Sequence, residues 1–145
     1  MKQSGRISLV LLASIVSVVV VAGILIFSRE SMSSVGQRFI EALYAKDVDT
    51  LTKMTMMSET PTESIHKQWD HAVNVAGKYY MFAYKIEGAT QSGPNSGSVK
   101  IQIVKDVDKP TAFPEHVEIP MVKVGDEWKV DIRNMDHELY PGLPR

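Results

Sequence analysis

Cysteine is absent from this chain of 145 residues. Its absence excludes a disulfide framework, a thiolate zinc site, a cysteine nucleophile and a lipid-modified cysteine. The remaining composition, 44% hydrophobic and 23% charged, is typical of a globular protein rather than a disordered or fibrous one. The chain is therefore expected to hold one small domain that folds without covalent crosslinks.

Charge is missing from one long stretch. Residues 7–27 carry no charged side chain, whereas all 17 acidic residues and 14 of the 16 Lys and Arg residues follow residue 27. The part after residue 27 has a formal charge of −3, because 14 basic side chains oppose 17 acidic ones. It has no basic surplus to bind nucleic acid through counterion release, so nucleic acid is not an expected partner.

The uncharged stretch is long enough to cross a bilayer. As a helix rising ~1.5 Å per residue, residues 7–27 would extend about 31 Å, which matches the ~30 Å hydrocarbon core. The alternative is a cleaved secretory signal, which normally has ~7–15 apolar residues and then a small-x-small cleavage site. Here the small pair Ala22-Gly23 is followed by four more apolar residues. We therefore expect an uncleaved transmembrane signal anchor over residues 7–27.

The flanking charges predict how this anchor is oriented. Lys2 and Arg6 precede the stretch, whereas Arg29 follows it beside Glu30. Because basic residues next to a span are retained on the cytoplasmic side, residues 1–6 are expected in the cytoplasm. The protein would then be a single-pass inner-membrane protein with an extracytoplasmic, periplasmic domain. Residues 28–33 would be a spacer of at most about 20 Å, which keeps that domain close to the lipid bilayer.

Three helices are expected at the start of the domain. Apolar residues recur at helical intervals after Ser33 and Ser34, which predicts a helix over residues 34–46, and Asp47 ends it and caps a short second helix. Thr60-Pro61-Thr62-Glu63 has the pattern of a capping box and begins a third helix, for which Gly77 supplies a left-handed end. The apolar stripes of the first and third helices are Val35, Phe39, Ile40, Leu43 and Tyr44, and Ile65, Trp69, Ala72, Val73 and Ala76.

From residue 78 the hydrophobic period changes to two, which is typical of strands. Alternating residues predict strands over about 80–86, 99–103, 117–121 and 128–132, and the short connections make the sheet an antiparallel meander. Residues 88–98 contain three glycines and a proline among small polar residues, so a mobile hairpin loop is expected there. Residues 134–145 form a C-terminal tail whose apolar side chains are expected to pack against something.

Two segments give a family resemblance. They are Val35-Gly-Gln-Arg-Phe-Ile-Glu-Ala-Leu-Tyr-Ala-Lys-Asp-Val-Asp49 and Val122-Lys-Val-Gly-Asp-Glu-Trp-Lys-Val130. In this order and separation they resemble the opening helices and closing hairpin of the NTF2-like (cystatin-like α+β cone) superfamily. The resemblance implies an α+β domain over residues 34–133, with about three helices packed on a curved antiparallel sheet of at least four strands. In that superfamily the cone holds a pocket used for catalysis, ligand binding or assembly, so the fold alone assigns no role.

The reactive side chains give little support for an enzyme. His66 and Asp70 are four residues apart on one helix, but both are offset from its apolar stripe, so we interpret them as a solvated surface pair. His66 and His71 lie about 140° apart around that helix, which prevents joint chelation of a metal. The methionines Met54, Met56 and Met57 are interpreted as core packing rather than a Cu(I) site. We expect no catalytic constellation, metal site or cofactor.

Aromatic and tail residues remain as candidates for binding. Rings occur on both faces of the first predicted strand, which exceeds the need of one buried face, so Tyr79 is expected at a partner surface, at a pocket mouth or under the tail. The predicted partner or pocket contacts are Tyr79, Phe113, Leu139, Tyr140 and Leu143. The leading hypothesis is a non-catalytic accessory or assembly subunit of a larger membrane protein complex. The alternative is a module that binds a small apolar ligand in the cone.

Overall fold

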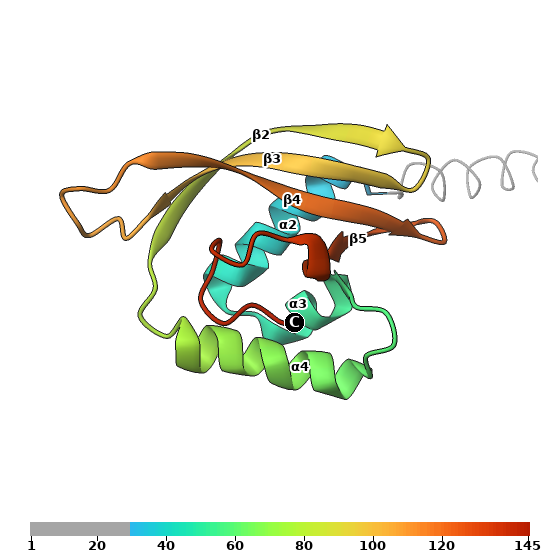
Figure 1. Ribbon diagram of the computed structural model, residues 1–145, viewed down its shortest axis with the longest axis horizontal. Coiled ribbons are helices and arrows are strands. Elements are labelled where there is room, and N and C mark those ends of the chain that lie inside the picture. Colours follow the sequence, from blue (N-terminus) through green and yellow to red (C-terminus); the bar gives the residue numbers. More distant parts are fainter. Residues whose placement is uncertain (1–29) are drawn as a thin grey trace, which may run out of the picture. The chain divides into compact units, whose positions relative to one another are not determined.

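The computed structural model describes residues 30–145 (Figure 1). Within this range no helix combines the length and the apolar character that a membrane span requires. The predicted anchor over residues 7–27 and the predicted cytoplasmic residues 1–6 lie outside the described residues, so both stay predictions.

The first two helices begin at side-chain caps. Ser31 caps the first helix, with its Oγ accepting a hydrogen bond from the Ser34 N–H at 3.2 Å, so this helix begins slightly earlier than expected. Lys46 ends it in the left-handed conformation, with φ of 57°. Asp47 caps the second helix as predicted, and its Oδ1 accepts from the Thr50 N–H at 3.1 Å. The helices are α2 (Met32–Ala45), α3 (Val48–Met54) and α4 (Thr62–His71).

The start and end of α4 differ from the expectation. The capping box does not form, because Pro61 is the N-cap and the Thr60 hydroxyl donates instead to the Ser58 carbonyl at 3.4 Å. At its end α4 continues into a π-helical turn, η1 (Ala72–Ala76). Gly77 follows with φ of −99°, so the predicted left-handed end is also wrong. This glycine is needed for another reason: a Cβ there would lie 2.4 Å from the Tyr140 hydroxyl oxygen.

Five strands form one sheet in the order β1-β5-β4-β3-β2. The four longer strands pair antiparallel, which confirms the predicted meander. The fifth, β1, is a two-residue strand that pairs parallel to β5 through Thr55 and Val130, and it is too short to give a periodic signal. The strands are β1 (Thr55–Met56), β2 (Phe82–Gly93), β3 (Ser96–Lys105), β4 (Pro114–Val124) and β5 (Glu127–Asp131).

The expected loop over residues 88–98 is mostly strand. β2 runs to Gly93 and β3 begins at Ser96, so only two residues turn between them. The small polar residues pair across the hairpin, and Ser96 also pairs with Val122 of β4. Backbone groups supply these bonds whatever the side chains are. Two register shifts interrupt the β2–β3 pairing, one between Ile86 and Gly88 and one near Gly93.

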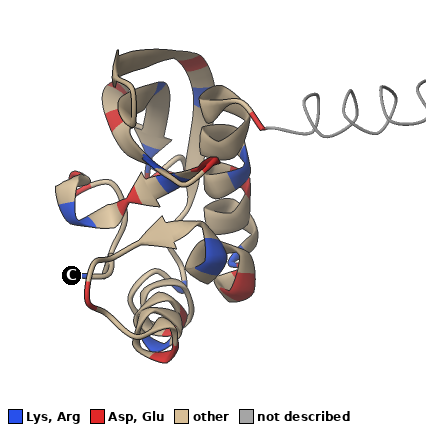
Figure 2. Cartoon of the chain, turned by 90° about the vertical axis from the view of Figure 1, so that its right-hand side faces the viewer, with Lys and Arg blue, Asp and Glu red and all other residues tan. Residues whose placement is uncertain are grey.

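The core lies between the helices and one face of the sheet (Figure 1). The predicted inward residues of β3 and β4, such as Ile101 and Ile119, are fully buried, as are Phe39 and Trp69 from the helices. The Trp69 ring meets the Phe39 ring edge-on, with centroids 5.8 Å apart. The structure is therefore an α+β domain with three α-helices on a five-stranded sheet. Charged residues of both signs are interspersed over its helices and strands (Figure 2).

The C-terminal tail is part of this core. After a 3₁₀ turn, η2 (Ile132–Asn134), the chain runs between α4 and the sheet (Figure 1). Leu139, Tyr140 and Leu143 are buried there. Gly142, with φ of 70°, approaches the π-helical turn so closely that a Cβ would lie 2.7 Å from the Ala76 Cβ. The tail expected to pack against something thus packs on its own domain.

Candidate functional site

An apolar hollow of about 660 Å³ lies where α2 ends and β2 begins. Its walls come from the last turn of α2, the segment that leads into β2, the loop after β3 and the tail. We call it the Tyr79 groove. It is lined by Leu43, Tyr44, Lys46, Lys78, Tyr79, Tyr80, Met81, Phe82, Ala83, Val107 and Tyr140. Its volume is within the range of about 300–1,000 Å³ that small-molecule sites occupy.

Edge-on aromatic contacts hold the walls in place. Tyr44, 63% exposed on α2, meets the Phe82 ring with centroids 5.7 Å apart. Tyr80 meets the buried Tyr140 ring at 5.2 Å. Rings that are fixed by such contacts present a rigid apolar surface, which a ligand can occupy without ordering the protein first.

Two tyrosine hydroxyls at this site stay protonated over the neutral pH range. Burial, and then the charges of Asp106 and Glu115 and the neighbouring Tyr140, raise the pKa of Tyr80 to about 12. Burial also raises the pKa of Tyr140. The Tyr80 hydroxyl donates to the Leu139 carbonyl, and the Tyr140 hydroxyl donates to the Gly77 carbonyl, each at 3.4 Å. These bonds tie the tail to the wall of the groove.

Two lysines supply the only formal charges among the groove's lining residues. The Lys46 Nζ donates a hydrogen bond to the Lys78 carbonyl, which joins the end of α2 to the segment before β2. The Lys78 Nζ lies 5.2 Å from the centroid of the Tyr79 ring, a cation–π contact. The groove therefore combines an apolar interior with positive charge at two points of its lining.

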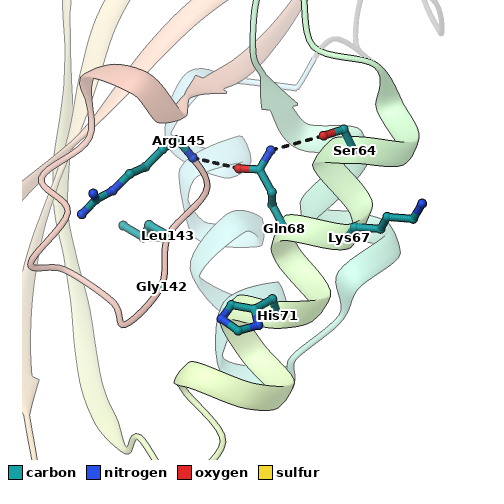
Figure 3. Close-up of a pocket in the computed structure, with 7 residues that line it drawn as sticks. All are labelled: Ser64, Lys67, Gln68, His71, Gly142, Leu143 and Arg145. Atoms are coloured by element: carbon teal, nitrogen blue, oxygen red, sulfur yellow. Dashed lines mark hydrogen bonds between the residues drawn. The ribbon is translucent and has the colours of Figure 1, made fainter.

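Four of the five predicted contact residues line hollows, and these hollows are three different ones; Leu139 lines none of them. Tyr79 is 84% exposed and lines the groove together with Tyr140, which places the two at one pocket. Phe113, 67% exposed, lies instead at a polar hollow of about 240 Å³. Leu143 lines a hollow of about 360 Å³ beside α4, where the Arg145 N–H donates to the Gln68 Oε1 at 3.0 Å (Figure 3).

The three tail residues among these contacts are buried. Leu139, Tyr140 and Leu143 are exposed by only 0%, 1% and 5%. Their side chains pack within the domain, and Tyr140 and Leu143 each line a hollow. Of the predicted contacts, only Tyr79 and Phe113 present exposed rings.

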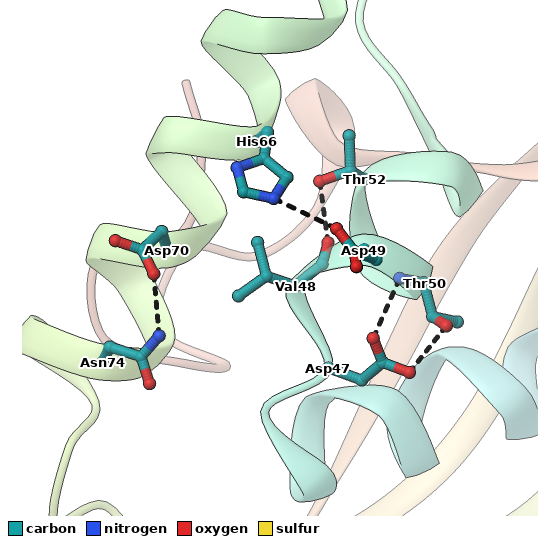
Figure 4. A network of polar contacts seen from close by, with 8 residues as sticks. All are labelled: Asp47, Val48, Asp49, Thr50, Thr52, His66, Asp70 and Asn74. Carbon is teal, nitrogen blue, oxygen red and sulfur yellow. Dashed lines mark hydrogen bonds and ion pairs between the residues drawn. The ribbon is translucent and has the colours of Figure 1, made fainter.

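The predicted surface pair of His66 and Asp70 does not form. His66 Nε2 lies 3.1 Å from Asp49 Oδ1 of α3, whereas Asp70 accepts a hydrogen bond from Asn74 Nδ2 at 2.8 Å (Figure 4). The His66 and Asp49 side chains are 46% and 80% exposed, so their contact is a solvated surface contact. Helical spacing could not reveal it, because α3 and α4 supply one partner each.

Metal ligands do not gather in the part of the chain that the structure describes: no three His, Asp or Glu side chains there are grouped to hold an ion. Met54 and Met57 are buried in the core, in agreement with the packing interpretation, whereas Met56 is only partly buried and is not a core residue. Nine of the eleven groove residues are not among the predicted contacts: Leu43, Tyr44, Lys46, Lys78, Tyr80, Met81, Phe82, Ala83 and Val107. The sequence signal nearest to them is the aromatic run with rings on both faces of the first strand. The prediction that Tyr44 belongs to the buried stripe of the first helix is wrong, because Tyr44 is exposed.

Comparisons with known proteins give fold neighbours only. No protein-family model matches the chain, and no curated protein sequence matches it. Among solved structures it is similar to an NTF2-like transpeptidase from Campylobacter jejuni, with 15% identity, a TM-score of 0.44, and coverage of 66% of this chain and 92% of that one. It is also similar to a ketosteroid isomerase-like protein from Erwinia carotovora atroseptica, with 11% identity, a TM-score of 0.42, and coverage of 66% and 85%. At these values neither similarity transfers an activity to the chain.

Proposed function

We propose that the chain is a non-catalytic, membrane-anchored extracytoplasmic module that binds a small apolar ligand in the Tyr79 groove. The observation that carries this proposal is the groove itself, about 660 Å³ in volume and lined mainly by aromatic and aliphatic side chains. The membrane anchor and the extracytoplasmic location rest on the uncharged residues 7–27 and the basic residues before them.

We infer that the scaffold of this module is NTF2-like. The support is the order of its elements: three helices come first, then an antiparallel meander whose buried face they cover. The non-catalytic part of the proposal is supported by the groove's lining, which is made of apolar residues, tyrosines and lysines. Tyrosine can act as a general acid or base, but the Tyr80 and Tyr140 hydroxyls each donate to a backbone carbonyl, and the pKa of Tyr80 is raised to about 12, far from neutral pH.

Native mass spectrometry of the full-length chain, released from mild detergent, tests the ligand proposal. The expected spectrum has a retained non-protein mass in the wild type. Ala83→Trp, which fills the groove, is expected to abolish it. Ala89→Trp is the matched control, because Ala89 is also exposed on β2 but does not line the groove. A wild type free of bound mass, or equal retention in both variants, would contradict the proposal.

A second candidate function is the accessory subunit of a larger membrane protein complex. The exposed rings of Tyr79 and Phe113 favour it, because large exposed apolar side chains often mark partner surfaces. The buried tail removes one of the surfaces that this hypothesis used, which is why the ligand-binding function stands first.

Co-purification in mild detergent tests the second candidate. Under this hypothesis a partner accompanies the wild type and is lost from Tyr79→Ser/Phe113→Ser. The control is Tyr79→Phe/Phe113→Tyr, which keeps both rings and should keep the partner. Recovery of the wild type only as a free chain would speak against a subunit role.

A further inference from the structure

We infer that the ligand of the Tyr79 groove is a single-chain amphipathic carboxylate, with its apolar chain in the groove and its anionic head at Lys46 and Lys78. This inference rests on the proposed ligand-binding function and specifies the chemical class of the ligand. The lining of the groove, the partners of its two lysines and its volume support this inference.

The interior of the groove suits an acyl chain. Leu43, Phe82 and Tyr140 are buried at its base, while Tyr44, Met81 and Val107 are exposed on its walls. Burying these exposed side chains under a ligand gains roughly 25 cal/mol per Å² of apolar surface removed from water. Met81 is unbranched and can change its rotamer to fit a flexible chain, and Val107 adds a small aliphatic surface beside it.

The two lysines make the groove complementary to an anion. Neither Lys46 nor Lys78 pairs with a carboxylate among the ion pairs of residues 30–145, and no lining residue is acidic. The nearest acid of the adjoining loop, Asp106, pairs with Lys109 at 3.0 Å. The two lysines lack a carboxylate partner although acidic residues outnumber basic ones in the sequence after residue 27. A lysine that is not neutralised within the domain is a natural partner for a carboxylate, and hydrogen bonds to charged groups are stronger than neutral ones.

The size of the groove favours a single-chain carboxylate over a two-chain lipid of the bilayer. Its volume of about 660 Å³ falls in the middle of the small-molecule range, which is enough for one chain.

Photoaffinity labelling of the full-length chain tests the inference. The chain is placed in nanodiscs of neutral phosphatidylcholine and labelled with a diazirine analogue of palmitate or with the matching neutral alcohol. Labelled peptides are mapped by mass spectrometry. The expected result is labelling by palmitate at residues 43–46 and 78–83. Lys46→Gln/Lys78→Gln should reduce it about tenfold, as expected for a loss of about 1.4 kcal/mol, and leave the alcohol labelling unchanged.

Lys85→Gln is the matched control: Lys85 is exposed on β2 outside the groove, so this variant should label as the wild type does. Equal labelling by both probes, unaffected by the double variant, would overturn the carboxylate inference while leaving apolar binding intact. No labelling of the groove by either probe would overturn both. If phosphatidylglycerol in the nanodisc displaces the palmitate probe, the ligand is an anionic bilayer lipid and the inference of a free carboxylate fails.

Discussion

Thr55 links three segments of the core through one hydroxyl. Its Oγ1 donates to the Leu51 carbonyl at 2.7 Å and accepts from the Trp69 Nε1–H at 2.8 Å. Trp69 is fully buried, so its N–H has no access to water if this acceptor is lost. A buried donor without a partner costs about 1–3 kcal/mol.

Thr55→Val, which keeps the shape and removes the acceptor, should therefore lower the free energy of unfolding by about 1–3 kcal/mol. Thr52→Val is the matched control, because the Thr52 hydroxyl donates only to a helix carbonyl, that of Val48. Its cost should stay below about 1 kcal/mol. Urea unfolding of the full-length chain in mild detergent, followed by tryptophan fluorescence, measures both. Equal costs would contradict the role of the Trp69 bond.

The raised pKa of Tyr80 predicts that the domain loses stability at alkaline pH. Its pKa is about 12 in the folded chain and 10.0 in the unfolded one. Its contribution is complete below pH 10, and it is lost as the pH rises to about 12, because the unfolded chain releases the proton first. Tyr84 and Tyr140 have pKa values raised in the same direction.

The free energy of unfolding should accordingly fall between pH 10 and 12, and fall less steeply in Tyr80→Phe. The variant is expected to keep part of the decline, since Tyr84 and Tyr140 still titrate. The measurement is the same urea unfolding, repeated at several pH values from 8 to 12. Wild type and variant with identical slopes would rule out Tyr80 as a contributor.

The burial of single residues could be predicted from the sequence where the hydrophobic period of a helix alone determines which side chains face the core. The stripe of the third predicted helix placed Ile65, Trp69 and Val73 correctly in the core, because a helix repeats regularly and its neighbours cover one side. Ala76, the last residue of that stripe, is exposed at the end of the π-helical turn. Tyr44 was predicted on the equivalent stripe of α2, yet it is 63% exposed. It lies in the last turn of α2, where its ring meets Phe82 of β2 from the side and lines the groove.

At the scale of elements, the contact between the tail and the π-helical turn depends on glycine. Gly142 has φ of 70°, and a Cβ there would lie 2.7 Å from the Ala76 Cβ. Gly125, in the β4–β5 turn, has a similar φ of 62°, but a Cβ there would have no heavy atom within 4 Å. An alanine at either position would adopt a left-handed backbone conformation, but only at residue 142 would its Cβ also clash with a neighbouring side chain.

Gly125→Ala should therefore cost about 1–2 kcal/mol, the penalty of a left-handed alanine. Gly142→Ala should cost about 1–3 kcal/mol more, because it also overpacks the space between tail and helix. Thermal or urea unfolding of the two variants measures the difference. A cost for Gly142→Ala no larger than that for Gly125→Ala would mean that the tail yields easily.

The element order was predictable, whereas several ends were not. Hydrophobic periods gave three helices and four of the five strands, and Asp47 correctly marked the boundary between the first two helices. The predicted capping box at residues 60–63 does not form, because the Thr60 hydroxyl donates to the Ser58 carbonyl instead. The local sequence does not determine which of these two bonds forms. The hairpin of β2 and β3 was longer than expected because pairing with β4 extends a strand that its own residues do not favour.

At the scale of the whole molecule, the predicted anchor governs how the chain fractionates. The full-length chain should stay in the membrane pellet after alkaline carbonate extraction, because the uncharged residues 7–27 are long enough to span the bilayer. A variant with two lysines in that stretch, Val18→Lys/Val19→Lys, should be released, since each charge costs about 2.5–3.5 kcal/mol at the centre of a span. The control is Val18→Leu/Val19→Leu, which should remain in the pellet.

Protease added to spheroplasts should remove the domain from the outer face. Protection of the domain, or release of the wild type by carbonate, would contradict the predicted orientation or anchor.

The complete groove could not be predicted from the sequence. Tyr79 and Tyr140 were predicted as contacts, but only folding brings Lys46 and Lys78 to the same pocket. Residues from α2, the β2 approach and the tail share no sequence pattern.

Within residues 30–145, β2 is the last strand of the sheet, and one row of its peptide groups has no neighbouring strand. Its two register shifts divide that row into short stretches, and Lys85 and Glu87 place charges next to one of them. A kinked, charged edge resists the addition of a strand from a neighbouring copy, so this feature disfavours fibrous aggregation through β2.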